Sequence, residues 1–321
     1  EHYRNELADD IEYHNFIQFL FFKQWGDVKR YANENGIKII GDIPIFVAAD
    51  SSDAWANPEI FLFDEERKPV KVAGVPPDYF SATGQLWGNP LYNWQKLKET
   101  NYSWWVERVR ANLSTCDIIR IDHFRGFEAY WAVPYGDDTA INGQWEPGPG
   151  IDLFNAIKSQ LGELPIIAED LGLMTQGVID LREATGFPGM KILGFAFDSG
   201  EENDYLPHTY TKNCVVYTGT HDNDTLIGWF QKAKEEDRQF ARDYLNSRSD
   251  DEIHWDAIRG AWSSVANMAI SPVQDFLGLG SEARINTPGV AAGNWQWRLK
   301  HGVLTDELAD RIAKLTKVYS R

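Results

Sequence analysis

Six short apolar runs, rich in Ile and Val, recur along the chain and are separated by segments of helical character. The runs are IKIIGDIPIFV (37–47), CDIIRIDHF (116–124), LPIIAED (164–170), MKILGFAF (190–197), CVVYTGTHD (214–222) and MAISPVQDF (268–276). Strands that alternate with helices indicate βα units and a parallel sheet. Runs that are apolar almost throughout are typical of strands covered on both faces. We therefore expect an α/β protein with about six parallel strands.

The segments between these runs predict helices. They cover 3–35, 95–113, 150–161, about 225–247, a stretch that reaches residue 266, and 304–319. Residues 48–94 contain no long periodic segment and are rich in Gly, Pro, Asn and aromatic residues, so we expect a long ordered loop, of the kind that is usually functional. No repeat and no Pro/Ser linker divides the chain. We expect a single domain over 1–321 with 48–94 as an inserted loop region.

Composition excludes several classes of protein. The formal net charge is −17, which argues against a nucleic-acid partner and favours a neutral ligand. No run of 18 apolar residues exists, so no membrane span is expected. The two cysteines, Cys116 and Cys214, each precede an apolar run, which predicts buried thiols and a reducing compartment such as the cytoplasm.

Motifs for cofactors and metals are missing from the sequence. The first strand run continues into GDIPIFVAADSSDAW without the glycine-rich turn that a doubly wound dinucleotide fold needs. Neither a Walker motif nor a Gly-x-Ser-x-Gly elbow occurs, and the spacings of His and Cys fit no metal site. We expect no cofactor and no metal. The polar groups that remain at the strand ends are carboxylates.

Three of the predicted strands end in acids: Asp122, the pair Glu169 and Asp170, and Asp222. In a parallel barrel, catalytic groups lie at the carboxyl ends of several strands. Cleavage of a glycosidic bond through a retained intermediate needs two carboxyl groups, one an ionised nucleophile and the other a protonated acid. We therefore expect these acids to converge on one cleft.

Neighbouring residues suggest a role for the first acid. Residues two apart on a strand share a face, so Arg120 and Asp122 point the same way. A guanidinium favours the ionised carboxylate that a nucleophile requires. A buried structural ion pair is the alternative for these two residues.

The second acid, Glu169, follows the apolar residues 166–168. Apolar surroundings raise the pKa of a carboxyl group, as a general acid requires. Alternatively, Glu169 or Asp170 caps the next helix, and Asp170 fits that role better. We assign the chemistry to Glu169.

The third acid lies in THDNDT (220–225). Asp224 precedes a predicted helix and is expected to be its N-cap, whereas Asp222 lies at the strand end. His221 beside it could donate a hydrogen bond to a substrate hydroxyl, and a purely structural His is the alternative.

These segments carry a family resemblance. RIDHFRGFEAYW (120–131), IIAEDLG (166–172) and TGTHDNDT (218–225) resemble, in order, the three catalytic segments of the amylomaltases, which are the 4-α-glucanotransferases of glycoside hydrolase family 77. GDIPIFVAADSSDAW is similar to an earlier segment of that family, GVPPDYFSATGQLWGNPLYNW to its substrate loop and INTPGVAAGNWQWRL to its C-terminal signature. The resemblance runs along nearly all of the chain.

The resemblance implies a TIM-type (β/α)8 barrel that acts on α-1,4-glucans and maltooligosaccharides, with roles for particular residues. Asp122 would be the nucleophile, Glu169 the acid/base and Asp222 the stabiliser of the transition state. Supporting groups would be Arg120, His221 and Asp42, and the acceptor side of the substrate loop would be formed by Asp78, Phe80, Gln85, Trp87 and Asn89. Trp87 offers a stacking face, and packing within the loop is the alternative for its aromatic residues. His123 also matches but receives no role, since strand alternation points it away from Asp122 unless the strand has ended.

The family's chain begins upstream, with two further barrel strands. The resemblance therefore implies a barrel that is incomplete here, with about six strands, the first two missing, and a missing N-terminal segment as a partner. We expect the runs 37–47 and 268–276 to form bare sheet edges, and 1–321 alone to be poorly soluble, oligomeric or inactive.

Two other functions compete with transfer. A retaining hydrolase of the α-amylase type would use the same acids and admit water. A glucan-binding module without catalysis would bind the same ligand and release no product.

Overall fold

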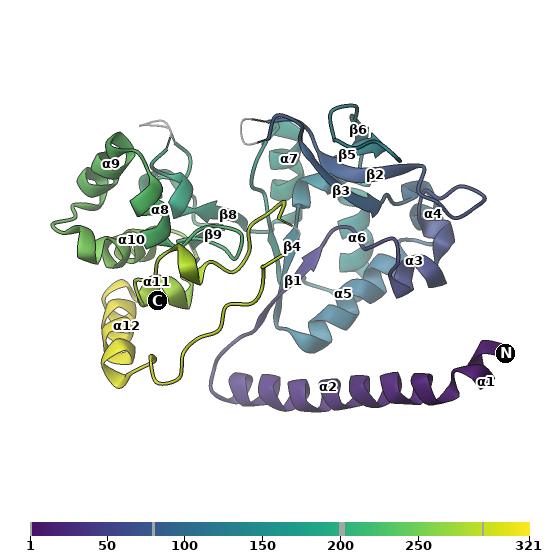
Figure 1. The fold of residues 1–321 in the computed structure, drawn as a ribbon, viewed down its shortest axis with the longest axis horizontal. Coiled ribbons are helices and arrows are strands. Elements are labelled where there is room, and N and C mark those ends of the chain that lie inside the picture. The colour runs from purple at the N-terminus through teal and green to yellow at the C-terminus, as the bar shows by residue number, and fades with distance from the viewer. Residues whose placement is uncertain (1, 79–80, 199–202, 291) are drawn as a thin grey trace. The chain divides into compact units, whose positions relative to one another are not determined.

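The computed structural model describes residues 2–78, 81–198, 203–290 and 292–321. The chain forms two compact units, 1–187 and 188–321. Figure 1 shows the ribbon with its elements labelled.

In the first unit, three parallel strands form a sheet in the order β1-β4-β7. The strands are β1 (Ile40–Pro44), β4 (Ile118–Asp122) and β7 (Ile166–Ala168). β1 pairs only with β4 among the described strands, and such an edge position tolerates Pro44, which lacks a backbone N–H. The register places Asp42 opposite Arg120 and Pro44 opposite Asp122, so the carboxyl ends of the strands are aligned.

Helices precede and follow these strands, as the βα pattern predicts. They are α3 (Ser52–Ala56), α4 (Trp94–Glu99), α5 (Ser103–Thr115), α6 (Ile151–Leu161) and α7 (Gln176–Thr185). The helix expected over 95–113 is divided between α4 and α5, because Asn101 and Tyr102 adopt left-handed backbone conformations. Aromatic side chains dominate the core of this unit: Tyr92, Trp105, Phe124, Phe127 and Phe154 are buried together.

A second sheet of the first unit was not expected from the sequence. Its antiparallel order is β3-β2-β5-β6, with β2 (Lys71–Val75), β3 (Gln85–Pro90), β5 (Ala129–Pro134) and β6 (Gln144–Pro147). The region 48–94 therefore contains a helix and two strands where a loop was predicted. These strands have five and six residues and contain Gly or Pro. They are therefore too short to show the alternation of apolar and polar residues by which a strand is recognised in a sequence. β3 pairs with β2, and β2 pairs in turn with β5, whose residues lie about 60 positions further along the chain.

The N-terminal helices α1 (His2–Glu6) and α2 (Ala8–Glu34) confirm the helix expected over 3–35, and Gly36, with φ +74°, follows its end. α2 contains no buried residue. It is attached to the unit through Trp25, whose indole N–H donates to the carbonyl of Thr115 at 2.7 Å, and through Asn33, which donates to Asp117 at 2.9 Å. The rest of α2 exposes many aromatic side chains, namely Tyr13, Phe16, Phe19, Phe21, Phe22 and Tyr31.

The second unit holds the other three expected parallel strands, in the order β10-β9-β8. They are β8 (Gly189–Ile192), β9 (Cys214–Tyr217) and β10 (Met268–Ile270). The helices of this unit are α8 (Leu226–Lys232), α9 (Glu235–Leu245), α10 (Ile253–Trp262), α11 (Val273–Phe276) and α12 (Asp306–Tyr319). Short 3₁₀ turns of the two units cover Pro58–Ile60, Phe124–Phe127, Leu193–Phe195, Pro207–Thr209, Asp250–Glu252 and Ser281–Ala283.

The α/β class and all six parallel strands are confirmed, but in the described residues they form two sheets of three. β1 and β10 are edge strands, as expected. The run 268–276 is a strand only as far as Ile270, because Pro272 cannot donate to a sheet and α11 begins at once. Cys116 and Cys214 are free and buried, as predicted. The described part of the chain contains no helix with the length and apolar character needed to cross a bilayer.

Candidate active site

Arg120 organises the carboxyl ends of β1 and β4. One guanidinium nitrogen, Nη1, lies 2.8 and 2.7 Å from the two oxygens of Asp42 and 3.0 Å from Oδ1 of Asp122. Strand register and alternation place the three side chains on one face. The predicted pairing of Arg120 with Asp122 is confirmed, and Asp42 is a second acid on the same cation.

The charge of Arg120 is nearly buried, with 8% of its side chain exposed. Burial by itself would lower the pKa of the guanidinium, but the charges of Asp42, Asp122 and Glu169 outweigh burial and raise that pKa. Arg120 is therefore a permanent cation in direct contact with the carboxylates of Asp42 and Asp122.

Glu169 directly follows β7, and its backbone N–H donates to the carbonyl of Ile121 at 3.0 Å. Its two carboxyl oxygens accept backbone hydrogen bonds from His123 (2.7 Å) and Leu171 (2.9 Å). Burial, followed by the charge of Asp122, raises the pKa of Glu169 to about 7, although Arg120 and the two backbone donors act in the opposite direction. A substantial fraction of Glu169 is therefore protonated at neutral pH.

Asp170 has a structural role, but it does not cap a helix as the sequence suggested. Its carboxylate is buried and forms an ion pair with Arg182 of α7 at 2.6 Å. The cap position of α7 belongs to Thr175, because five residues separate Asp170 from that position. Asp170 thus holds α7 to the end of β7.

His123 follows the last residue of β4 in a left-handed conformation, with φ +54°, so strand alternation no longer applies to it. Its ring meets the Trp87 ring edge-on, with centroids 4.8 Å apart. Burial, with Arg125 second, lowers the pKa of His123 to about 3, so the imidazole is neutral. His123 thus contacts both Trp87 of β3 and Glu169, which it can do because β4 ends at Asp122.

The other predicted loop residues differ in their contacts. Trp87 lies on β3, is 37% exposed, and donates its indole N–H to Gln85 at 3.2 Å. Asn89 donates to the carbonyl of Val47 at 3.0 Å and so fixes the segment that follows β1. Asp78 is exposed and accepts a hydrogen bond from the backbone of Ser81 at 2.7 Å. Phe80 lies outside the described residues.

Asp222 lies in the second unit, five residues beyond the end of β9 at Tyr217. The expectation that it sits at the strand end is wrong, because Gly219 and the following residues form a turn in which Asn223 accepts hydrogen bonds from Thr220. The carboxylate of Asp222 accepts from Asn286 at 2.5 Å, and its carbonyl accepts from Arg284 at 2.6 Å.

His221 lies beside this carboxylate. Its Nε2 is 3.4 Å from Oδ2 of Asp222, and its ring centroid is 5.1 Å from that of Trp295. Asn286 also donates its backbone N–H to the carbonyl of His221. Arg284, Asn286 and Trp295 therefore hold His221 and Asp222 in place.

Asp275 anchors the loop 218–225 at both ends. It is 2% exposed, and its two oxygens accept from the Thr218 hydroxyl (2.7 Å) and from the backbone of Leu226 (2.9 Å). Burial, its largest influence, raises the pKa of Asp275 to about 6. The N-cap of α8 is Thr225 rather than the expected Asp224, whose carboxylate instead contacts Lys232 and Ser281.

The structure thus brings Asp42, Arg120, Asp122 and Glu169 together in the first unit and holds Asp222 and His221 in the second. The convergence of the two sets stays a prediction. The sequence analysis gave no role to Arg284, Asn286 or Asp275, although Asn286 and Asp275 lie in motifs quoted there and Arg284 directly precedes one of them. In the described residues, no cluster of three His, Cys, Asp or Glu side chains could hold a metal ion.

Comparisons with known proteins identify the family of this chain. The 4-alpha-glucanotransferase family, glycoside hydrolase family 77, matches residues 1–305. The 4-alpha-glucanotransferases of Clostridium butyricum and Synechocystis sp. are each 55% identical, over 100% and 99% of this chain and 66% and 63% of their own lengths. An amylomaltase from Streptococcus agalactiae, solved in complex with acarbose, superposes with a TM-score of 0.97 at 42% identity, over 99% of this chain and 65% of that one.

Parallel strands whose carboxyl ends hold a buried arginine among acids define an α/β protein with a carboxylate-based site. The chain belongs to the 4-alpha-glucanotransferase family, glycoside hydrolase family 77. It spans about two thirds of the length of the relatives it matches.

Proposed function

We propose that this protein transfers α-1,4-glucan segments to the 4-hydroxyl of an acceptor glucan or glucose through a covalent sugar–aspartate intermediate. One observation carries the proposal: a buried arginine contacts Asp42 and Asp122, beside a buried Glu169 with a pKa of about 7. Retaining cleavage of a glycosidic bond requires these two protonation states in neighbouring carboxyl groups.

In the first step, Asp122 attacks the anomeric carbon while Glu169 gives its proton to the glycosidic oxygen. The bond to the leaving glucan breaks, and a glycosyl ester forms on Asp122. In the second step, Glu169, now ionised, takes the proton of the acceptor 4-hydroxyl, whose oxygen displaces Asp122.

Other residues stabilise or position the sugar in this proposal. Arg120 keeps Asp122 ionised before attack and favours its release as a carboxylate in the second step. Asp42 fixes Arg120 and shapes the sugar site. Asp222 stabilises the oxocarbenium-like transition state, and His221 binds a sugar hydroxyl. Trp87, Gln85, Asn89 and Asp78 form or support the acceptor side, which favours a sugar over water.

The proposal includes an architecture. The six parallel strands would belong to one TIM-type barrel domain, in which Asp222 joins Asp122 and Glu169 in one cleft, and the inserted region 48–94 would contribute its substrate loop, residues 74–94. The family membership and the likeness to an amylomaltase solved with acarbose support this architecture. Two buried free thiols support a reducing compartment, the cytoplasm or a plastid.

Incubation of the complete protein with maltotriose, followed by chromatography and a reducing-end assay, tests the function. Glucose with longer maltooligosaccharides and a constant number of reducing ends is the expected result. Glucose with maltose and rising reducing ends would identify a hydrolase. Unchanged maltotriose would reject catalysis and leave a glucan-binding protein.

A further inference from the structure

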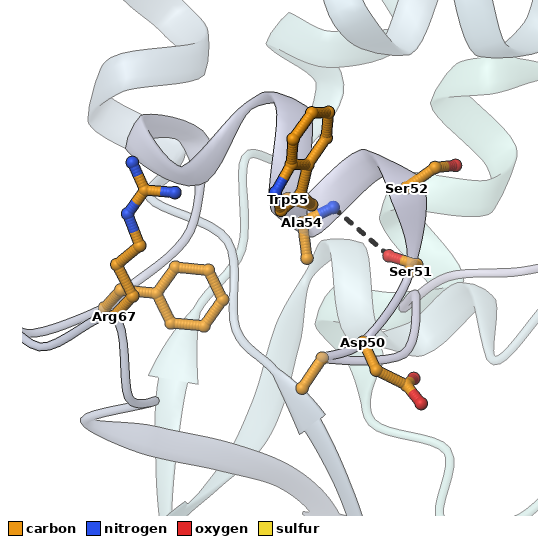
Figure 2. A pocket seen from close by; sticks show the side chains of 8 residues that line it. Asp50, Ser51, Ser52, Ala54, Trp55 and Arg67 are labelled. Atoms are coloured by element: carbon orange, nitrogen blue, oxygen red, sulfur yellow. Dashed lines mark hydrogen bonds between the residues drawn. The ribbon is translucent and has the colours of Figure 1, made fainter. Parts of the chain in front are cut away.

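Trp55 is the most exposed of the 13 tryptophans, with 78% of its surface accessible. It stands on the short helix α3, next to a hollow with a cavity volume of about 390 Å³. The lining of the hollow includes Asp50, Ser52, Trp55, Phe63 and Arg67. Figure 2 shows Arg67 across the hollow from Ser52 and Asp50. None of these residues takes part in the candidate active site.

The side of the hollow that carries Trp55 is rigid, although its indole is exposed. The Ser51 hydroxyl accepts from the backbone of Ala54 at 3.1 Å, which caps α3, and Figure 2 shows this bond. Asp53 accepts from the indole N–H of Trp104 at 3.2 Å, and Ala54 is buried. Hence Trp55 presents an aromatic face on a fixed backbone, which limits the entropy lost when a ligand binds.

The opposite side is fixed as well. The turn 64–68 closes through a hydrogen bond from Asp64 N–H to the carbonyl of Lys68 at 2.9 Å, and the Asp64 carboxylate accepts from the backbone of Glu66 and Lys68. Arg67 holds a left-handed conformation in this turn, with φ +61°, which glycine would adopt at lower cost. Because an arginine occupies this position in place of a glycine, we infer that its guanidinium has a functional role.

The polar groups of the hollow are free to bind. Among the residues that the structure describes, the Asp50 carboxylate, the Arg67 guanidinium and the indole N–H of Trp55 have no hydrogen-bond partner. An aromatic face beside a few convergent donors and acceptors suits a sugar ring, whose C–H groups stack on the indole while its hydroxyls hydrogen-bond. Glu65 and Glu66 next to Arg67, together with the net charge of −17, disfavour an anionic ligand.

We propose that Trp55, Arg67 and Asp50 form a second carbohydrate site, which binds an α-glucan chain at the protein surface without taking part in catalysis. The choice of α-glucan rests on the proposed function. Such a site would hold a long substrate on the enzyme while its end reacts, so it would matter for polymers and be dispensable for short oligosaccharides.

The test uses the full chain and three variants. Trp55→Ala removes the stacking face, Arg67→Gly removes the guanidinium at a backbone position that suits glycine, and Tyr135→Ala removes a matched aromatic that is 55% exposed elsewhere. Because the altered side chains are exposed, all three should keep the thermal midpoint of the unmodified protein.

Retardation in native gels that contain soluble starch should weaken about three- to tenfold for Trp55→Ala and Arg67→Gly, and remain unchanged for Tyr135→Ala. The kcat/KM for maltotriose should be unchanged in all three. Equal retardation of Trp55→Ala and Tyr135→Ala would overturn the site. A parallel loss of maltotriose turnover in Trp55→Ala would also overturn it, by placing Trp55 in the catalytic cleft. A failure of the proposed function can be told apart from a failure of this site. In that case the unmodified chain would leave maltotriose unchanged, whether or not starch slows its migration in the gel.

Discussion

The two units of this chain hold their acids in different ways. In the first unit, Asp42 and Asp122 lie on adjacent strands and share one buried cation, Arg120. In the second unit, Asp222 lies in a turn beyond its strand and is held by an amide, Asn286, and by a hydrogen bond from Arg284 to its backbone. The first arrangement fixes both charge and position. The second fixes position, and within the described part of the chain no guanidinium contacts the Asp222 carboxylate.

This difference matches the different tasks proposed for the acids. A nucleophile must be ionised before the reaction begins, and a buried arginine ensures that. A stabiliser of developing positive charge is most effective when its own negative charge is not already neutralised by a cation.

The largest effect should follow replacement of the acid held by Arg120. Asp122→Asn should lower transfer by at least about 10³-fold and leave glucan binding nearly intact, because the variant loses the covalent route and keeps a side chain of the same shape. Rates on maltotriose and the dissociation constant for a maltooligosaccharide measure the two properties. Retention of more than about a tenth of the activity would reject Asp122 as the nucleophile.

Glu169→Gln should come next, with a loss of about 10²- to 10⁴-fold for poor leaving groups. An activated donor such as a glycosyl fluoride needs little protonation, so its first step should be partly spared. The matched control is Asp170→Asn, which breaks the ion pair with Arg182 and should lower the thermal midpoint without this selectivity. Equal losses for both donor types would show that Glu169 is not the acid.

In the second unit, Asn286→Ala should cost about tenfold in kcat with a smaller change in KM. Asp222 would keep its charge but lose the amide that orients it. The comparison requires this loss to be far smaller than that of Asp122→Asn. If kcat fell as far in Asn286→Ala as in Asp122→Asn, the orientation of Asp222 would matter as much as the charge of Asp122, and the proposed contrast between the two units would be wrong.

The smallest effects concern stability, and here each unit holds one buried carboxyl with a raised pKa: Glu169 at about 7 and Asp275 at about 6. A carboxyl whose pKa is raised in the folded state contributes stability that is fully present below its unfolded pKa and is lost as the pH rises through its folded pKa. Glu169→Gln should therefore flatten the pH dependence of stability between about pH 4.5 and 7, and Asp275→Asn between about pH 4 and 6.

Each of these changes should amount to no more than roughly 3 kcal/mol. Thermal midpoints of the unmodified chain and both variants, measured across pH 4 to 8, provide the comparison. If the thermal midpoint of the unmodified chain rose with pH more steeply than the midpoints of both variants, the predicted direction of the pH dependence would be wrong.

The contrast between the units also shows what the sequence could predict. Arg120, Asp122 and Glu169 were predictable because they lie on strands or directly after them, where alternation fixes the face and apolar neighbours signal burial. Asp222 was identified, but its setting was not, because turns such as 218–225 follow no period. Its partner Asn286 lies 64 residues away in sequence, so only the fold reveals the contact.

Other misses have the same physical origin. His123 received no role because one residue of uncertainty in the strand end reverses the direction of a side chain. β2 and β3 were missed because strand formation depends on pairing as well as on composition, and β2, which joins β3 to the sheet, pairs with β5, a strand distant in sequence. The pocket beside Trp55 joins α3 to a turn ten residues later, and no spacing rule predicts such a contact.

The central claim is that the acid held by Arg120 forms a bond to the sugar while Glu169 handles protons. The Glu169→Gln variant of the full chain can be incubated with a glycosyl fluoride whose own 4-hydroxyl is blocked, so that the first step proceeds and the second stalls without a base. Mass spectrometry of the digested protein then locates any attached sugar. The account predicts a glycosyl group on the peptide that contains Asp122. Attachment to another acid, or consumption of the donor with no attached sugar, would contradict it.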